Sequence, residues 1–191
     1  MQEIWHMVKN KPLNKIAIVG PESTGKSAMA QFLSKELKTI AVPEYARYYC
    51  AELNRSYTLQ DEVNMFYGQI AVEDALTPFA RNEILICDTT VLNVKIWCDH
   101  LFDHTPEYIL KEIKHRPYKG YLLMDIDLPW EDDPLRDFPN ERAHFMEVWE
   151  KELTLLKANY IKVSGLKEER FQNGLTALKN LLLARSQTDN K

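Results

Sequence analysis

Short apolar runs alternate along the chain with longer segments in which apolar residues recur every three or four positions. This alternation is typical of strands followed by helices. The apolar runs predict five strands, at residues 15–19, 38–42, 83–88, 120–127 and 160–163. We therefore predict an α/β fold of three layers, in which helices flank a five-stranded, mainly parallel sheet.

The predicted helices carry one-sided apolar stripes. A helix is predicted at 28–37, and Thr58 with Asp61 forms a capping signature for a long helix that ends near residue 78. Further helices are predicted at 91–102 and at 106–114, the latter capped by Thr105, and after residues 139 and 165. We assign the stripes of the last two helices to the core; they are Phe145, Trp149, Leu153, Leu156, Phe171, Leu175, Leu178 and Leu182.

Residues 20–27 match the phosphate-binding pattern G-x-x-x-x-G-K-[ST]. A chance match in a glycine–serine turn is the alternative, but a predicted strand precedes the loop and a predicted helix follows it, as the motif requires. Gly20 and Gly25 permit backbone angles at which successive N–H groups point at phosphate oxygens. We expect Lys26 to reach the β- and γ-phosphates of ATP and Ser27 to ligate Mg²⁺. The expected ATP-binding residues are Gly20, Glu22, Ser23, Thr24, Gly25, Lys26, Ser27 and Ala28.

Two acids follow predicted strands, at the edge where open parallel sheets bind their ligands. Asp88 is a candidate Mg²⁺ ligand or a contact to a substrate hydroxyl; alternatively it caps the next helix. Glu44 is a candidate to accept the proton of an attacking hydroxyl, or else it pairs with Arg47, three residues further on. Which of Glu44 and Asp88 is the base stays open at this point.

The segment 128–139 is polar, proline-rich and aperiodic, so we predict a loop there. Arg136 is a candidate to close over the phosphates and stabilise the transferring group, or else to form an exposed ion pair with a neighbouring aspartate. Trp130 either anchors the loop or stacks on a flat ligand. Asp125 and Asp127 precede the loop at the same sheet edge.

Composition narrows the class of protein. The chain has 191 residues, of which 45% are hydrophobic and 27% are charged, and this suits a single domain with its own core. We expect the domain at 15–185, an N-terminal extension at 1–14 and a polar tail at 186–191. The net charge of −4 without a basic stretch argues against a nucleic-acid partner. There is no membrane-length apolar run or signal core, and the three cysteines lack metal spacing, so we expect a cytoplasmic protein.

Several classes of phosphate-loop protein are excluded by the motifs that the chain lacks. It has neither an N-K-x-D guanine motif nor a D-x-x-G switch, and no L-S-G-G-Q transporter signature. Asp88-Thr89 stands where an assembly ATPase usually has an Asp-Glu pair. A small-molecule kinase remains, with acids near the loop and an arginine in a mobile lid.

Four segments occur together in a recognisable order. They are the loop at 20–27, Glu44-Tyr45-Ala46-Arg47, Asp88-Thr89 and Trp130-Glu131-Asp132-Asp133-Pro134-Leu135-Arg136. Over residues 15–185 the chain resembles the ribosylnicotinamide kinase domain of bacterial NAD-salvage regulators, a member of the P-loop kinase superfamily. The resemblance implies a sheet order of 2-3-1-4-5, with the third strand beside the phosphate loop. The Glu44–Arg47 element is also similar to one in deoxyribonucleoside kinases, in which the glutamate is the base.

The resemblance implies phosphorylation of the 5′-hydroxyl of nicotinamide riboside, with ATP and Mg²⁺ as cofactors. The implied catalytic residues are Lys26, Glu44, Asp88 and Arg136, and the implied metal ligands are Ser27 and Asp88. The implied substrate-binding residues are Glu44, Tyr45, Arg47, Asp88, Trp130 and Asp133, of which Tyr45 and Trp130 are candidates to stack on the pyridinium ring.

The chain departs from the family pattern at two positions. Thr90 replaces an acid and Pro134 replaces a glycine, and both changes put the identity of the substrate in doubt. Two alternatives therefore remain: a kinase for another nucleoside or small alcohol, and a regulator that binds ATP without turnover. The oligomeric state is left open.

Overall fold

The computed structural model describes residues 12–184, so the predicted tail and most of the predicted extension lie outside the described residues. The strands are β1 Asn14–Val19, β2 Ala41–Val42, β3 Ile84–Asp88, β4 Gly120–Met124 and β5 Tyr160–Val163. The helices are α1 Lys26–Glu36, α2 Tyr45–Ala51, α3 Leu59–Leu76, the short 3₁₀ helix η2 Thr77–Phe79, α4 Val91–Phe102, α5 Glu107–His115, α6 Arg142–Leu155 and α7 Lys167–Leu183. In this described part of the chain, no helix combines the length and the apolar character that crossing a bilayer requires.

The strands form one sheet of order β2-β3-β1-β4-β5, and all its strand pairs are parallel. This confirms the predicted α/β fold and the predicted strand order. β1 lies in the middle, and the register pairs Ile18 with Asp88 of β3 and Val19 with Leu123 of β4. Since parallel strands end at the same sheet edge, three strand ends meet where the phosphate loop begins.

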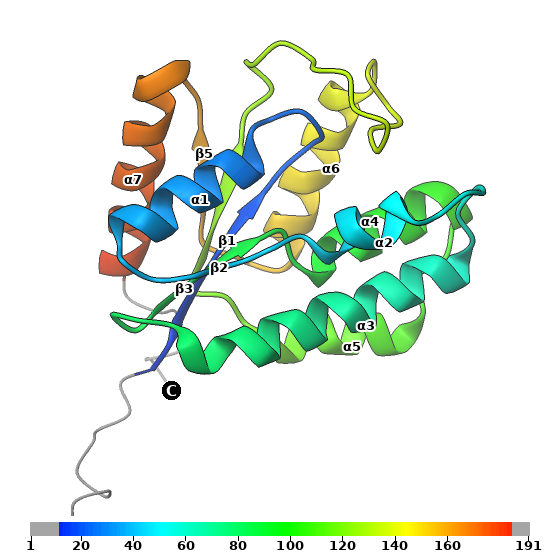
Figure 1. Ribbon diagram of the computed structural model, residues 1–191, viewed down its shortest axis with the longest axis horizontal. Coiled ribbons are helices and arrows are strands. Elements are labelled where there is room, and N and C mark those ends of the chain that lie inside the picture. Colours follow the sequence, from blue (N-terminus) through cyan, green and yellow to red (C-terminus); the bar gives the residue numbers. More distant parts are fainter. Residues whose placement is uncertain (1–11, 185–191) are drawn as a thin grey trace, which may run out of the picture.

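Helices cover both faces of the sheet, which gives the three predicted layers (Figure 1). On one face α1 and α7 pack on the sheet through residues such as Met29 and Leu178. On the other face α4 and α6 do so through Ile96 and Trp149, and α3 and α5 pack against α4. The stripes assigned to the core from the sequence are confirmed, because all their members are buried or packed against a core cluster.

Two strands are shorter than predicted because local polar contacts end them. Lys38 has a left-handed φ of 51°, and the backbone N–H of Thr39 bonds to the carbonyl of Ser34 at 2.9 Å, so the chain turns at residues 37–38 and strand pairing begins only at Ala41. β4 ends at Met124, because the carboxylate of Asp125 accepts a hydrogen bond from the Ile126 N–H at 2.9 Å. Such a contact favours a turn over a strand.

Of the two predicted helix caps, one is confirmed and one is wrong. The capping box of α3 is confirmed, with the Asp61 carboxylate accepting from the Thr58 backbone N–H at 2.8 Å. The predicted Thr105 cap is wrong. Its hydroxyl donates to the carboxylate of Asp99 at 2.6 Å, and Pro106 occupies the cap position of α5. A nearby carboxylate on the preceding helix therefore outcompetes the backbone for this hydroxyl.

The close approach of α2 to α3 gives a first testable prediction. A Cβ at Gly68 would lie 2.0 Å from the ring of Tyr45, so Gly68→Ala should displace the ring. We expect the free energy of unfolding to fall by about 1 to 3 kcal/mol, as measured by chemical denaturation. In a Tyr45→Ala background the same change should cost little, and an equal cost in both backgrounds would contradict the contact.

Candidate active site

The phosphate loop follows β1 as predicted and turns on two glycines. Gly20 has a φ of 134° and Gly25 a φ of 77°, values that favour glycine. A Cβ at Gly20 would also lie 2.8 Å from the carbonyl oxygen of Met124 on β4. Gly25 is the N-cap of α1, so the free N–H groups of the first helical turn adjoin the loop, as anion binding requires.

Lys26 begins α1 and reaches back across the loop. Its ammonium group donates to the carbonyl oxygens of Gly20 at 3.0 Å and Pro21 at 2.8 Å. The Thr24 hydroxyl donates to the same Pro21 carbonyl at 2.8 Å. The charge of Lys26 therefore lies at the loop, within reach of an anion bound there.

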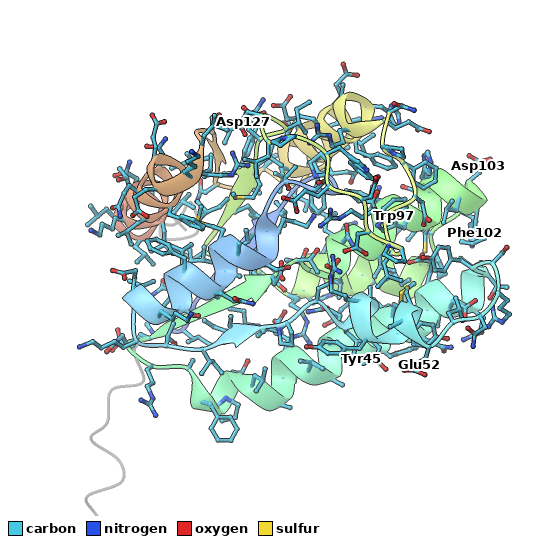
Figure 2. The ribbon with its side chains drawn as sticks, turned by 45° about the horizontal axis from the view of Figure 1, so that its top comes forward. Tyr45, Glu52, Trp97, Phe102, Asp103 and Asp127 are labelled. Carbon is cyan, nitrogen blue, oxygen red and sulfur yellow. The ribbon has the colours of Figure 1, made fainter. Side chains whose placement is uncertain are left out.

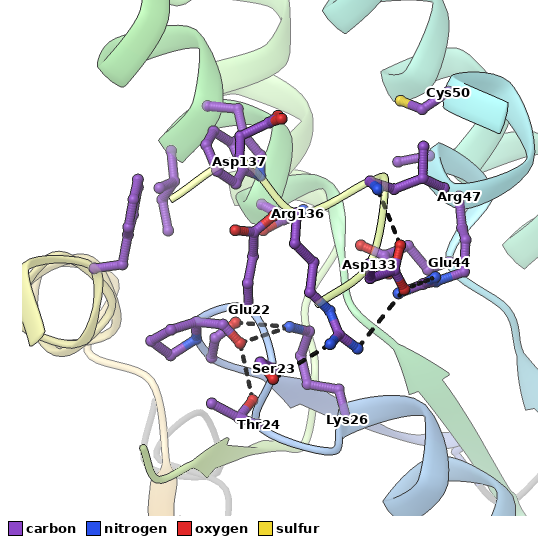
Figure 3. A pocket seen from close by; sticks show the side chains of 18 of the residues that line it. Glu22, Ser23, Thr24, Lys26, Glu44, Arg47, Cys50, Asp133, Arg136 and Asp137 are labelled. Atoms are coloured by element: carbon purple, nitrogen blue, oxygen red, sulfur yellow. Dashed lines mark hydrogen bonds and ion pairs between the residues drawn. The ribbon is translucent and has the colours of Figure 1, made fainter. Parts of the chain in front are cut away.

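A cleft of about 420 Å³ opens beside the loop (Figure 3). Its walls come from the loop, α2, the beginning of α3, α4, α6 and the segment 131–137. The predicted site residues that line it are Gly20, Glu22, Ser23, Thr24, Gly25, Lys26, Ser27, Ala28, Glu44, Arg47, Asp133 and Arg136. Residues from distant parts of the sequence thus meet in one cavity.

Asp88 lies just behind the cleft, at the end of β3, and is 5% exposed. The pKa of its carboxyl group is raised to about 6, mainly by burial and secondly by the charge of the nearby Glu44 carboxylate. A hydrogen bond with Ser27 and the charges of Lys26 and Arg47 act in the opposite direction. Asp88 therefore adjoins the phosphate loop with a charge that the surrounding protein compensates only in part.

The alternative role of Asp88 as a helix cap is wrong. Thr90 caps α4, with its hydroxyl oxygen accepting a hydrogen bond from the Leu92 N–H at 3.1 Å. The Oδ1 atom of Asp88 is buried and has no hydrogen-bond partner within residues 12–184. Threonine at position 90 thus leaves the Asp88 carboxylate available for another partner.

Glu44 stands directly before α2 and lines the cleft. Its expected partner, Arg47, donates instead to the carboxylate of Asp133 at 2.9 Å. This hydrogen bond is the main reason why the pKa of Arg47 is raised, and Glu44 and Asp88 contribute less through their charges. The direct Glu44–Arg47 pair is therefore replaced by a contact between α2 and the 128–139 segment.

The segment 128–139, called the lid from here on, has the predicted loop conformation and rests on the phosphate loop. The hydroxyl oxygen of Ser23 accepts hydrogen bonds from the Glu131 N–H at 2.9 Å and from the Arg136 guanidinium at 3.3 Å. Arg136 also donates to the Glu131 carbonyl and lies 3.8 Å from the Asp133 carboxylate. Arg136 thus combines a contact to the phosphate loop with the neighbouring ion pair that was its alternative.

Two aromatic residues expected to stack on a ligand lie outside the cleft lining. Tyr45 packs against Gly68. The indole N–H of Trp130 donates to Asp132 at 2.9 Å, and its ring lies 6.0 Å from the Arg136 guanidinium. Tyr45 thus joins two helices and Trp130 braces the lid from within, while their stacking on a ligand stays a prediction.

Comparison with known proteins places this site in a family. A family model described as AAA domain matches residues 15–170. The chain belongs to this family.

This AAA domain is also similar to a curated relative and to solved structures. It is 24% identical over 161 residues to the trifunctional NAD biosynthesis/regulator protein NadR of Salmonella typhimurium, a match that covers 80% of this chain and 38% of NadR. It superposes on a NadR protein in complex with NR with a TM-score of 0.76 and 16% identity, over 90% of this chain and 51% of that chain. It also superposes on deoxyadenosine kinase from M. mycoides with a TM-score of 0.60 and 17% identity, over 88% of this chain and 100% of that chain. The predicted resemblance to NAD-salvage regulators is thus confirmed, although the chain spans only about half or less of these NadR proteins.

The AAA domain holds its phosphate loop with a residue that the motifs did not reveal, Arg170 of α7. Arg170 is 4% exposed, and its guanidinium donates to the carbonyls of Thr24 at 2.9 Å and Asp125 at 2.8 Å and pairs with the Asp127 carboxylate. Asp125 and Asp127 therefore anchor α7 and do not line the cleft. Helical spacing could have indicated that Arg170 is buried, because it stands four residues before Gly174 on the buried face of α7.

Motif reasoning also missed three residues that line the cleft. Tyr57 precedes α3, Glu62 lies in its first turn, and Trp97 comes from α4; all three line the cleft. The ring of Trp97 lies 5.5 Å from that of Phe138, under the lid (Figure 2). These residues follow no fixed motif, so only the packing of three helices brings them together.

A second group of ligand-type side chains lies outside the cleft lining. Donor atoms of His100, Glu141 and His144 lie within 4.8 Å of one another. Imidazole and carboxylate donors suit zinc, whereas Mg²⁺ prefers oxygen donors. This group is therefore distinct in place and chemistry from the Mg²⁺ site predicted at Ser27 and Asp88.

Replacing Arg170 tests the support of the loop. Arg170→Met removes the donor from two backbone carbonyls and from Asp127, so we expect unfolding to become easier by about 3 kcal/mol and ATP binding to weaken. Denaturation curves and ATP titrations measure the two effects. Lys179→Met, at an exposed position of the same helix, is the control and should change neither stability nor ATP binding. An Arg170→Met protein with the stability of the wild type would contradict the role of Arg170 in holding the loop.

The raised pKa of Asp88 predicts a pH-dependent stability. Because the pKa lies at about 6 in the folded protein and at 3.8 ordinarily, folding stability is lost as the pH rises from about 4 to 6. At pH 7, Asp88→Asn should therefore raise the free energy of unfolding, by on the order of 3 kcal/mol at most. The gain should disappear near pH 4, as followed by melting temperature across this range.

Glu147→Gln is the matched control, because it removes a carboxylate from an exposed position of α6. Its melting temperature should follow the wild type at every pH. A stabilisation by Asp88→Asn that is equal at pH 4 and pH 7 would contradict the predicted titration.

Proposed function

We propose that the protein transfers the γ-phosphoryl group of ATP to the 5′-hydroxyl of nicotinamide riboside, giving nicotinamide mononucleotide and ADP. The observation that carries the proposal is a single cleft that is lined by the phosphate loop and also by Glu44, Tyr57 and Trp97 from distant parts of the chain. Such a cavity holds a phosphoryl donor and an acceptor side by side. The similarity to a NadR protein in complex with NR supports nicotinamide riboside as the acceptor.

The phosphates of ATP bind at residues 20–28 in this proposal. The loop N–H groups and the N-terminus of α1 face the phosphate oxygens. Lys26 exchanges the carbonyls of Gly20 and Pro21 for the β- and γ-phosphates. Because that exchange replaces neutral acceptors by charged ones, it strengthens the hydrogen bonds of Lys26.

Ser27 and Asp88 are the residues that would hold Mg²⁺. A hydroxyl and a carboxylate are the oxygen donors that this ion prefers, and the unpartnered Oδ1 of Asp88 is an atom that a cation would satisfy. When bound, Mg²⁺ supplies positive charge against the negative charge of the phosphates. The raised pKa of Asp88 agrees with a carboxylate that lacks compensation until its ligand is present.

Glu44 is the base that the geometry favours. It lines the cleft and Asp88 does not, so the Glu44 carboxylate is the more accessible of the two to an acceptor hydroxyl. The 5′-hydroxyl proton passes to Glu44 as the oxygen bonds to the γ-phosphorus and the bond to ADP breaks. Lys26 and Arg136 stabilise the charge on the transferred group, so catalysis rests on positioning and electrostatics.

A deoxynucleoside is the second candidate acceptor. The similarity to deoxyadenosine kinase, which covers 88% of this chain and 100% of the kinase, supports it. A regulator that binds ATP without turnover is the remaining alternative from a different class of function.

Release of ADP from ATP and Mg²⁺ by the purified protein, with a panel of nucleosides, tests the proposal. We expect release to depend on nicotinamide riboside and to stop when Mg²⁺ is chelated. Lys26→Ala should lower turnover by about 100-fold or more. Lys35→Ala, at an exposed position of the same helix, is the matched control and should behave as the wild type.

Each other outcome selects an alternative. Turnover with a deoxynucleoside but not with nicotinamide riboside would contradict nicotinamide riboside as the acceptor. ATP binding without acceptor-dependent ADP release overturns the kinase and favours the regulator. Unchanged activity in Lys26→Ala removes the phosphate loop from the mechanism.

A further inference from the structure

One acid in the cleft has no partner in the protein. Glu62 is 3% exposed and lines the cleft, and its carboxyl group forms no hydrogen bond or ion pair with residues 12–184. Its neighbour Asp61 is bonded by Arg55, Thr58 and Tyr49. The same helical turn thus holds one carboxylate with several donors and one with none.

The surroundings of Glu62 are poor in positive charge. Burial is the main cause that raises the pKa of Glu62 to about 8, and the charge of Asp61 adds to it. The groups coupled to it from the adjoining helices are the thiols of Cys50 in α2 and Cys98 in α4, which burial keeps neutral by raising their pKa. Among residues 12–184, therefore, no cation balances an ionised Glu62.

Glu62 lies in the part of the cleft away from the phosphates. It lines the cavity together with Cys50, Tyr57 and Met65, and its charge acts on the thiol of Cys50. Figure 3 shows Cys50 and Lys26 on opposite sides of Glu44. A carboxylate here faces the acceptor and not ATP, whose negative charge it would repel.

We propose that Glu62 forms a recognition subsite for a positively charged ring, and that its carboxylate pairs with the cationic heterocycle of the acceptor. A buried carboxyl group is stable only with a partner, and here the ligand is the available source of one. The inference rests on the proposed function and narrows it, because a pyridinium riboside satisfies the subsite whereas a ring that carries a carboxylate is repelled. Perturbed acids of this kind concentrate at functional sites for the same reason.

Binding of two small probes tests the subsite without any turnover. 1-Methylnicotinamide carries a pyridinium charge, and nicotinamide has the same carboxamide ring without it. Calorimetric titration of the wild type should give at least about tenfold tighter binding of the cation at pH 8.5. In Glu62→Gln this preference should disappear, while Glu52→Gln, an exposed charge removal nearby at the end of α2, should keep it.

The pH dependence distinguishes a binding role from a structural one. Since the pKa of Glu62 is about 8, binding of 1-methylnicotinamide should tighten about tenfold or more between pH 6 and pH 8.5, and binding of nicotinamide should stay level. Equal affinity for the two probes in the wild type, or a preference that survives in Glu62→Gln, overturns the subsite. Melting curves of Glu62→Gln show that the variant is folded.

Kinetics separates the two proposals. With nicotinamide riboside as acceptor, Glu62→Gln should raise KM by about tenfold with a smaller change in kcat, and the preference over the carboxylate analogue nicotinic acid riboside should narrow. If the wild type shows no kinase activity yet prefers the cationic probe, the kinase proposal fails and the subsite stands. If it phosphorylates a nucleoside but shows no preference for the cationic probe, the subsite fails and the kinase stands.

Discussion

The central position of β1 is the constraint on which the site depends. β1 is hydrogen-bonded to β3 on one side and to β4 on the other, so the phosphate loop starts from a point that cannot shift without breaking both pairings. Asp88 arrives beside the loop from β3, and Asp125 follows β4 on the other side. The first of these contributes a carboxylate whose Oδ1 atom has no partner among residues 12–184, and the second contributes a carbonyl that Arg170 ties to the loop.

Sequence patterns were sufficient where one interaction dominates. Burial of apolar stripes gave the elements and the sheet order followed from the family resemblance, while the spacing of the motif gave Gly20, Gly25 and Lys26 their places. Patterns failed where two local partners compete. The hydroxyl of Thr105 bonds to the Asp99 carboxylate of α4 and does not cap the backbone of α5. They also failed where a cavity arises from packing, because neither Glu62 nor Trp97 belongs to a motif. Tyr45 belongs to a motif-like element and packs against Gly68, a contact that no pattern in the sequence indicated, and its stacking on a ligand stays a prediction.

The distribution of charge in the cleft is unfavourable for folding alone. Burial raises the pKa of Glu22, Asp88 and Glu62, so each carboxyl group resists ionisation where it stands. A protein selected only for stability would lose little by replacing them with neutral side chains. Because perturbed acids concentrate at functional sites, their joint presence in and beside one cavity agrees with the ligand site proposed there.

The hydroxyl of Ser23 connects the lid to the phosphate loop. It accepts the Glu131 N–H and the Arg136 guanidinium at once, and it belongs to a loop residue with a φ of 56°. Any reorientation of that residue by a bound anion loosens both bonds in one movement, with no long pathway between the two sites. In the proposed kinase, a phosphate that reoriented Ser23 would therefore release the lid at the same time, and the freed guanidinium would already lie beside the loop.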